Sequence, residues 1–245
     1  MRFFKMNGLG NDYIFLENTN VPTASLVKRM CDVHYGIGAD GVVIYSKGVS
    51  TDLVMKIFNK DGTEAEMCGN ALRCLIRHYD KVGKNISVQT KAGIKTGIFD
   101  GDKVTVNLSK SVSYDTDYIK IICNSQEVLG KRINVGNPHF VIKEEYDDEL
   151  AKAISEKISI FPERTNVEFY SEINEEIFVR VYERGCGETL ACGTGAAAAF
   201  IASGKQNALI HLPGGILECS LNDKGEIIQK GKVDYNYQGE YRCFL

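Results

Sequence analysis

The chain has 245 residues, enough for one large domain or two lobes of ordinary size. Apolar residues make up 44% and charged residues 25% of it, as in typical globular proteins, and the net charge is −3. No basic stripe alternates with aromatic residues, and no apolar run approaches the roughly 20 residues of a membrane helix, so neither nucleic-acid binding nor membrane insertion is expected. The N-terminal residues lack the features of a secretory signal, so a cytoplasmic location is expected.

Short β-branched and aromatic runs, bounded by turn residues, predict a protein built mainly of strands. In chain order, the expected strands are residues 13–17, 42–45, 53–58, 86–90, 103–108, 166–170 and 178–182. Two helices are expected. Apolar side chains recur at helical spacing over residues 71–79, and residues 195–202 are rich in alanine. The pattern predicts an α+β protein.

The chain contains an internal repeat of its most distinctive motif. A strand ending in KIFN leads through a turn to Glu64 and then to MCGNA, which contains Cys68. Later, RVYE leads through a turn to Glu188 and then to ACGTG, which contains Cys192. The two glutamates and the two cysteines are therefore both 124 residues apart.

Three further motif pairs follow the same order at spacings of 122 to 126 residues: GNDYIF with GNPHFV, VIYS with EFYS, and AGI with GGI. The repeat predicts two pseudo-symmetric lobes, each a curved, mostly antiparallel sheet wrapped around a central helix. The polar stretch 109–117 suggests a boundary that divides the chain into lobes of residues 1–115 and 116–239.

Each repeat places a cysteine at the start of a helix, followed by a glycine. A helix N-terminus carries backbone N–H groups that lack partners within the helix, so it attracts a carboxylate and favours a thiolate. If both cysteines reach one substrate carbon from opposite faces, one can remove the α-proton and the other can return a proton. Two such groups, Cys68 and Cys192, are what inversion of an amino acid requires.

The eight cysteines suggest neither a disulfide framework nor a metal site. The chain is long enough to bury its own core, and no Cys-x-x-Cys pair is present, so thiols are expected and metal ligands are not. There is no convincing lysine-centred phosphate site for pyridoxal phosphate, so no cofactor is expected. The remaining thiols are expected to be structural: Cys31, Cys74, Cys123, Cys186, Cys219 and Cys243.

Six motifs in order along nearly the whole chain resemble those of the diaminopimelate epimerases. They are NGLGND at 7–12, MCGN at 67–70, GNPH at 136–139, ERTN at 163–166, ERGCGET at 183–189 and ACGTG at 191–195. The resemblance implies a cofactor-free isomerase that interconverts LL- and meso-2,6-diaminopimelate, for the biosynthesis of lysine and cell-wall precursors. It also implies a homodimer, and a last strand at 240–245 that returns to the first lobe.

The resemblance also implies roles for individual residues. Cys68 and Cys192 would be the acid/base pair, and His139 and Glu183 would tune them. The expected substrate-binding residues are Asn11, Asn59, Gly69, Asn70, Asn137, Asn166, Glu183, Arg184, Gly193 and Thr194. Two positions depart from the family pattern: Gly41 stands where some members have glutamine, and Cys186 stands where a small apolar residue is expected.

Three other functions fit parts of this pattern. A racemase of proline, hydroxyproline or histidine would share the fold, but the proline type carries Cys-Gly-His where this chain has Asn70. A thiol hydrolase or transferase would use Cys192 and His139 and would leave Cys68 without a role. A non-catalytic amino-acid-binding protein would tolerate serine at both cysteine positions.

Overall fold

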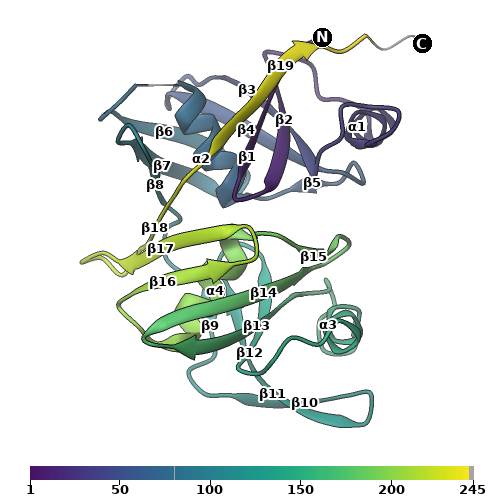
Figure 1. Ribbon diagram of the computed structural model, residues 1–245, viewed down its shortest axis with the longest axis vertical. Coiled ribbons are helices and arrows are strands. Elements are labelled where there is room, and N and C mark those ends of the chain that lie inside the picture. Colours follow the sequence, from purple (N-terminus) through teal and green to yellow (C-terminus); the bar gives the residue numbers. More distant parts are fainter. Residues whose placement is uncertain (80, 243–245) are drawn as a thin grey trace. The chain divides into compact units, whose positions relative to one another are not determined.

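The computed structural model describes residues 1–79 and 81–242, which form two compact units. The first comprises residues 1–106 and the chain from Gly231 onward, and the second comprises residues 107–230 (Figure 1). The α+β class and the two-lobed plan are confirmed. No helix in the described ranges is long and apolar enough to cross a membrane.

The first unit is a mostly antiparallel sheet in the order β19–β1–β2–β3–β4–β6–β7. Only the β2–β3 and β4–β6 pairs are parallel within this order. Its strands are β1 (Arg2–Gly8), β2 (Asn11–Glu17), β3 (Gly41–Lys47), β4 (Leu53–Asn59), β5 (Glu64–Ala65), β6 (Asn85–Thr90), β7 (Gly93–Phe99), β8 (Val104–Asn107) and β19 (Asp234–Glu240). Its helices are α1 (Ala24–Cys31) and α2 (Gly69–Tyr79).

The second unit repeats this plan in the order β10–β11–β12–β13–β14–β16–β17–β18. Its parallel pairs, β12–β13 and β14–β16, occupy the equivalent places. Its strands are β9 (Ser113–Tyr114), β10 (Ile119–Cys123), β11 (Gln126–Asn134), β12 (Pro138–Ile142), β13 (Asn166–Ile173), β14 (Glu176–Glu183), β15 (Gly187–Thr189), β16 (Asn207–Leu212), β17 (Gly215–Leu221) and β18 (Ile227–Gly231). Its helices are α3 (Asp148–Ser155) and α4 (Gly193–Ser203).

The central helices α2 and α4 lie against the sheets of their own units (Figure 1). The α4 sequence GTGAAAAFIAS is buried from Gly193 to Phe200, and a helix that is apolar on all sides belongs in a core. Small alanine side chains let the curved sheet approach it closely. The helix ends at Gly204, whose φ of 73° lies in the left-handed region that favours glycine.

The shorter helices α1 and α3 cover the other faces of the same sheets. Each begins with a capping side chain: Thr23 accepts a hydrogen bond from the Leu26 amide (3.2 Å), and Asp147 accepts one from the Leu150 amide (3.0 Å). Strands between two layers are buried on both faces, and the first five residues of β3 and of β13 are accordingly all buried.

The unit boundaries differ from those predicted at residues 115 and 239. Residues 107–115 belong to the second unit, because β9 pairs with β11. The chain returns to the first unit from Gly231, because β19 pairs with β1 and places Glu240 opposite Arg2. Of the predicted last strand at 240–245, residues 243–245 lie outside the described residues, and so does Cys243.

A carboxylate in the first unit ties the β3–β4 turn to β6. The Asp52 carboxylate accepts hydrogen bonds from the Ser87 amide (2.9 Å) and hydroxyl (2.7 Å). These bonds, the backbone amide first, lower the pKa of Asp52 from 3.8 to about 2. Stability from this group is therefore present above pH 3.8 and is lost as the pH falls through about 2.

We expect Asp52→Asn to lower the midpoint temperature of unfolding at pH 7 and to have progressively less effect from about pH 4 down to about pH 2. Circular dichroism melts of both proteins across that range measure the difference. Asp102→Asn is the control, since the Asp102 side chain is 68% exposed and its ion pair with Lys232 (3.3 Å) lies at the surface. A difference in midpoint temperature between wild type and Asp52→Asn that stays constant at all pH values would contradict the stabilising role of the Asp52 carboxylate.

Candidate active-site residues

The two repeated cysteines occupy the same position relative to the central helices. The Cys68 carbonyl accepts the first helical hydrogen bond of α2 from the Leu72 amide (3.0 Å). The Cys192 carbonyl accepts the equivalent bond of α4 from the Ala196 amide (2.9 Å). Each sulfur therefore lies at the end of a helix where the backbone N–H groups of the first turn carry a partial positive charge.

Cys68 is half-buried and has two partners from β2. The Tyr13 hydroxyl donates a hydrogen bond to Sγ at 3.1 Å, and the thiol donates to Asn11 Oδ1 at 3.8 Å. Asn11 and Tyr13 are two residues apart on one strand, so their side chains point to the same face of the sheet. β2 thus presents a donor and an acceptor to the Cys68 sulfur.

A chain of amides holds Asn11 in this orientation. Its Nδ2 donates to Asp40 Oδ2 (2.8 Å), and its Oδ1 accepts from Asn70 Nδ2 (3.0 Å). The Arg73 guanidinium, fully buried in α2, donates in turn to Asn70 Oδ1. Burial raises the pKa of Asp40. Since each amide has an assigned donor and acceptor end, Asn11 can present only its oxygen to Cys68.

Asn59 lies at the end of β4, where it pairs in register with Gly41. Gly41 in turn pairs with Tyr13. The Asn59 amide donates to the Thr63 hydroxyl (3.1 Å). The first unit therefore brings together the predicted residues Asn11, Cys68 and Asn70, with Gly69 directly after Cys68 at the start of α2. Asn59 lies on β4, two strands from Tyr13.

Cys192 is the N-cap of α4 and is 5% exposed. Its sulfur accepts a hydrogen bond from the Gly195 amide (3.3 Å) and lies 3.4 Å from the Thr194 hydroxyl. Burial, and then the negative charges of Glu183 and Glu168, raise the pKa of the Cys192 thiol well above its ordinary value. Both effects favour the neutral thiol over the thiolate.

His139 is fully enclosed by polar partners of the second unit. Its Nδ1 lies 2.6 Å from Glu168 Oε1, and its Nε2 lies 2.9 Å from Asn137 Oδ1. Asn137 Nδ2 then donates to the Thr194 hydroxyl (3.3 Å), next to the Cys192 sulfur. The imidazole is thus connected to the Cys192 sulfur through Asn137 and Thr194.

Glu168 is the important residue that the sequence analysis missed. Its side chain is completely buried, and burial raises its pKa against the opposing effect of His139. Its Oε1 also lies against the first turn of α4, where a Cβ at Gly195 would approach it to 2.8 Å. The available signal was a glutamate between the apolar residues Val167 and Phe169 of the predicted strand 166–170, since an ionisable residue in a buried strand needs a partner.

Glu183, Arg184 and Asn166 meet at the end of β14. Glu183 Oε1 accepts a hydrogen bond from the Thr189 hydroxyl (2.6 Å). The Asn166 amide accepts from the Arg184 backbone N–H (3.0 Å) and donates to the Pro138 carbonyl (3.1 Å). Asn166 therefore anchors the start of the turn that leads to Cys192, and it orients Arg184, whose guanidinium donates to the Glu163 carbonyl (3.0 Å).

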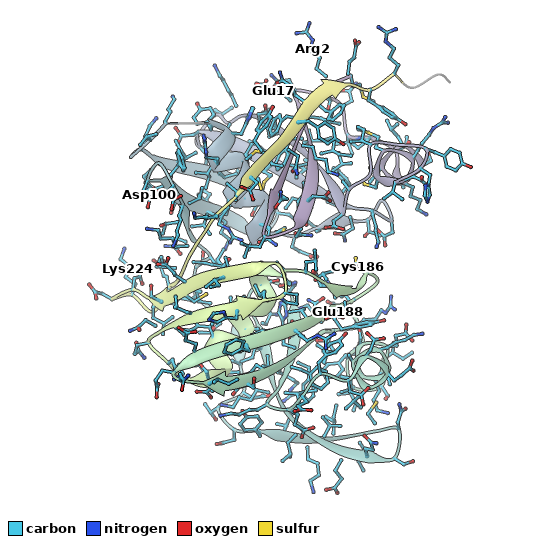
Figure 2. All side chains as sticks on the ribbon, in the orientation of Figure 1. Arg2, Glu17, Asp100, Cys186, Glu188 and Lys224 are labelled. Atoms are coloured by element: carbon cyan, nitrogen blue, oxygen red, sulfur yellow. The ribbon has the colours of Figure 1, made fainter. Side chains whose placement is uncertain are left out.

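The other described cysteines are reduced and have no place in these clusters. Cys31, Cys74, Cys123 and Cys219 are buried, and burial raises the pKa of Cys31 to about 12. Cys186 is half-buried on the turn between β14 and β15, close to the exposed edge marked by Glu188 (Figure 2). Within the described ranges, no group of three His, Cys, Asp or Glu side chains could hold a metal ion.

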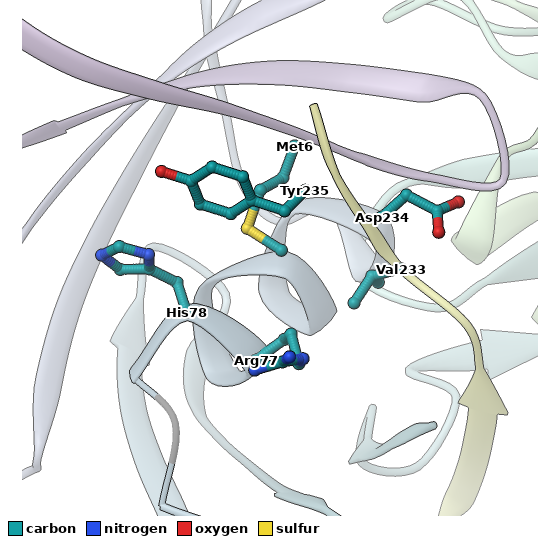
Figure 3. A pocket seen from close by; sticks show the side chains of 6 residues that line it. All are labelled: Met6, Arg77, His78, Val233, Asp234 and Tyr235. Carbon is teal, nitrogen blue, oxygen red and sulfur yellow. The ribbon is translucent and has the colours of Figure 1, made fainter. Parts of the chain in front are cut away.

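A separate pocket of the first unit lies at the other end of α2 from Cys68 (Figure 3). It is lined by Met6, Arg77, His78, Val233, Asp234 and Tyr235. The His78 ring is stacked on Phe4, with 3.6 Å between centroids, so this histidine is an aromatic packing element. None of the residues predicted for the active site lines this pocket.

Comparisons with known proteins agree with these features. The sequence matches the family described as diaminopimelate epimerase over residues 3–114 and 132–236. The diaminopimelate epimerase of Carboxydothermus hydrogenoformans is 35% identical, covering 98% of this chain and 99% of that protein. The corresponding protein of Natranaerobius thermophilus is 36% identical, with 98% of each chain covered.

Solved structures show the same fold at low identity. A hydroxyproline epimerase from Agrobacterium vitis superposes with a TM-score of 0.71 at 12% identity, over 98% of this chain and 91% of that one. A probable proline racemase from Agrobacterium radiobacter has a TM-score of 0.73 at 12% identity, over 98% and 92%. On the family match and the sequence relatives together, this chain belongs to the diaminopimelate epimerase family.

Proposed function

We propose that the chain interconverts LL- and meso-2,6-diaminopimelate without a cofactor, using Cys68 and Cys192 as its two acid/base groups. Membership of the diaminopimelate epimerase family supports the reaction and the substrate. The choice of residues is carried by one observation: the two cysteines occupy the same position at the start of the central helix in a repeated unit.

In the proposed reaction, one cysteine is a thiolate and takes the proton from the α-carbon. The electron pair stays on that carbon and is delocalised into the substrate carboxylate. The other cysteine is a thiol and gives its proton to the opposite face, so the configuration inverts and the two cysteines exchange protonation states. The backbone N–H groups at residues 69–70 and 193–194 would stabilise the carboxylate while it carries the additional negative charge.

The polar residues of the second unit support Cys192 as the proton donor of the resting enzyme. Its raised pKa keeps it a thiol at neutral pH, and Glu183 contributes to that shift. His139 would set the position of Thr194 through Asn137. Glu183 and His139 would therefore tune the Cys192 thiol without taking the α-proton themselves.

The far end of diaminopimelate is a second amino acid, with its own carboxylate and ammonium groups. Arg184 would pair with that carboxylate, since the planar guanidinium can donate two parallel N–H bonds to a carboxylate. Amide oxygens among Asn11, Asn59, Asn137 and Asn166 would accept from the ammonium. A substrate without this second charged end would lose these contacts.

The surroundings of His139 count against a thiol hydrolase. In such an enzyme an imidazole nitrogen bonds directly to the cysteine nucleophile. Here both ring nitrogens of His139 have other partners, Glu168 and Asn137. In the described part of the chain, the Cys192 sulfur instead contacts the Gly195 amide and the Thr194 hydroxyl.

The test is incubation of the reduced protein with LL-diaminopimelate in deuterium oxide. We expect one deuterium at the inverted α-carbon of each meso product, detected by NMR and by chiral chromatography coupled to mass spectrometry. Absence of both exchange and inversion would exclude the proposed function. Exchange with histidine or proline, but not with diaminopimelate, would favour a racemase of another amino acid.

We also propose that the protein is a cytoplasmic homodimer, as its family resemblance implies. Light scattering on the purified protein should give twice the mass of one chain. A mass equal to that of one chain would contradict the dimer, whatever the outcome of the exchange experiment.

A further inference from the structure

We propose that Tyr13 is the positioning residue that makes Cys68 the resting thiolate, and that Gly41 exists to make room for its ring. The inference deepens the proposed function and rests on it for its role in turnover. Its structural part concerns only the first unit. Neither Tyr13 nor Gly41 belongs to the residues that the family motifs implied for catalysis or binding.

The hydrogen bonds around Cys68 assign Tyr13 a specific direction. The phenolic hydroxyl donates to Sγ at 3.1 Å, while the thiol hydrogen points to Asn11 Oδ1 at 3.8 Å. Asn11 keeps this orientation because Asp40 and Asn70 occupy the other ends of its amide. When the thiol loses its proton, the long bond to Asn11 is lost and the bond from Tyr13 becomes charge-assisted, which strengthens it.

Gly41 explains why the Tyr13 ring can take this position. A Cβ at residue 41 would lie 2.9 Å from Tyr13 Cε1 and 2.5 Å from the Phe58 carbonyl oxygen. Any side chain here would therefore push the ring away from Cys68 or separate β3 from β4. Gly41, which departs from the family pattern, therefore leaves the space that the Tyr13 ring occupies on the neighbouring strand.

The second unit places a different residue at the equivalent position. In the repeat, GNDYIF aligns with GNPHFV, so Tyr13 corresponds to His139. The strand pairing agrees, because Tyr13 begins the parallel β2–β3 ladder and His139 begins the β12–β13 ladder. His139 bonds to Glu168 and Asn137, so its ring does not donate to the Cys192 sulfur.

This difference makes the two cysteines unequal before substrate binds. Burial, and then the nearby acidic groups, raise the pKa of Cys192, whereas a hydroxyl donor faces Cys68. The charged groups on the elements around Cys68 already have partners: Asp40 with Asn11, Asp12 with Lys5, and Arg73 with Asn70. Removing one hydroxyl from Tyr13 leaves all of these in place.

The test is the pH dependence of alkylation by iodoacetamide, measured separately for each cysteine by peptide mass spectrometry. In Tyr13→Phe we expect the alkylation midpoint of Cys68 to rise by about one pH unit, and its rate below both midpoints to fall about tenfold. The midpoint of Cys192 should not move. Tyr45→Phe is the matched control, since Tyr45 is also a buried tyrosine of this sheet and its hydroxyl faces His78 at 3.4 Å.

A second variant tests the role of Gly41. Gly41→Ala should raise the Cys68 midpoint in the same direction, and adding Tyr13→Phe to it should cause little further change, because both act on one hydrogen bond.

An unchanged Cys68 midpoint in Tyr13→Phe would overturn the inference, as would an equal shift at Cys192 or in Tyr45→Phe. Alkylation needs no substrate, so a protein that fails to epimerise diaminopimelate still reports on Tyr13. If the proposed function holds, the acidic limb of kcat/KM should shift upward with the alkylation midpoint.

Discussion

Replacing either Cys68 or Cys192 with serine is expected to lower kcat/KM for diaminopimelate epimerisation by about three orders of magnitude. A serine hydroxyl is far less acidic than a thiol, so it neither holds the negative charge needed to take the α-proton nor readily gives its proton to a carbanion. Since inversion needs both groups, the two single variants should lose similar amounts of activity. The double variant should be only slightly worse than either, because residues that act as a unit are not additive.

Deuterium exchange separates a two-base mechanism from a one-base mechanism. With a single cysteine remaining, a proton removed from one face can return only to that face, so residual exchange should exceed residual inversion. Cys186→Ser is the control, since that thiol is half-buried on the β14–β15 turn and forms no part of the proposed machinery. If Cys68→Ser epimerised diaminopimelate at a rate within tenfold of wild type, the two-cysteine mechanism would be contradicted. A mechanism that uses Cys192 alone would then be favoured.

Glu168→Ala is expected to cause the largest loss of stability, about 3 kcal/mol in the free energy of unfolding. The substitution removes the partner of His139 Nδ1 at a place where both side chains are completely buried. It also leaves a cavity beside Gly195 at the first turn of α4. Chemical denaturation measures the loss, and Cys192 alkylation should become faster because one of the negative charges that raise its pKa is gone.

Two further variants show whether burial and charge are the cause. Glu168→Gln keeps the shape and one hydrogen-bonding oxygen, so it should lose much less stability than Glu168→Ala. Glu172 lies on the same strand, but its carboxylate pairs with Lys143 at the surface. We therefore expect Glu172→Ala to lower the free energy of unfolding by less than about 1 kcal/mol. Equal losses in Glu168→Ala and Glu172→Ala would contradict the importance of the buried pair.

The same residue predicts a pH dependence. Burial raises the pKa of Glu168 above its unfolded value of 4.5. Stability from the protonated form is therefore fully present below pH 4.5 and is lost as the pH rises through the folded pKa. The difference in free energy of unfolding between wild type and Glu168→Gln should narrow as the pH rises through the folded pKa of Glu168, because glutamine does not titrate.

The amino-acid sequence by itself determined the α+β class, the duplicated plan and the two cysteines. These features are local or periodic. Residues 71–79 and 195–202 predicted the cores of α2 and α4, and the run 53–58 predicted β4 almost to its ends. The repeat then assigned Cys68 and Cys192 to equivalent positions without any knowledge of contacts. The short helices α1 and α3 were missed because each has only eight residues, with a narrow buried face.

Only the tertiary structure decided which side chains act on those cysteines. Glu168 and His139 are 29 residues apart, and Tyr13 and Cys68 are 55 apart, so no sequence pattern links either pair. Tertiary packing brings them together: β12 lies beside β13, and α2, which begins directly after Cys68, packs against β2. The pairing of β19 with β1 likewise joins the two ends of the chain, and it was expected only from the family resemblance and not from any local pattern. Local sequence thus placed the reactive groups, while long-range packing set their partners and their charge.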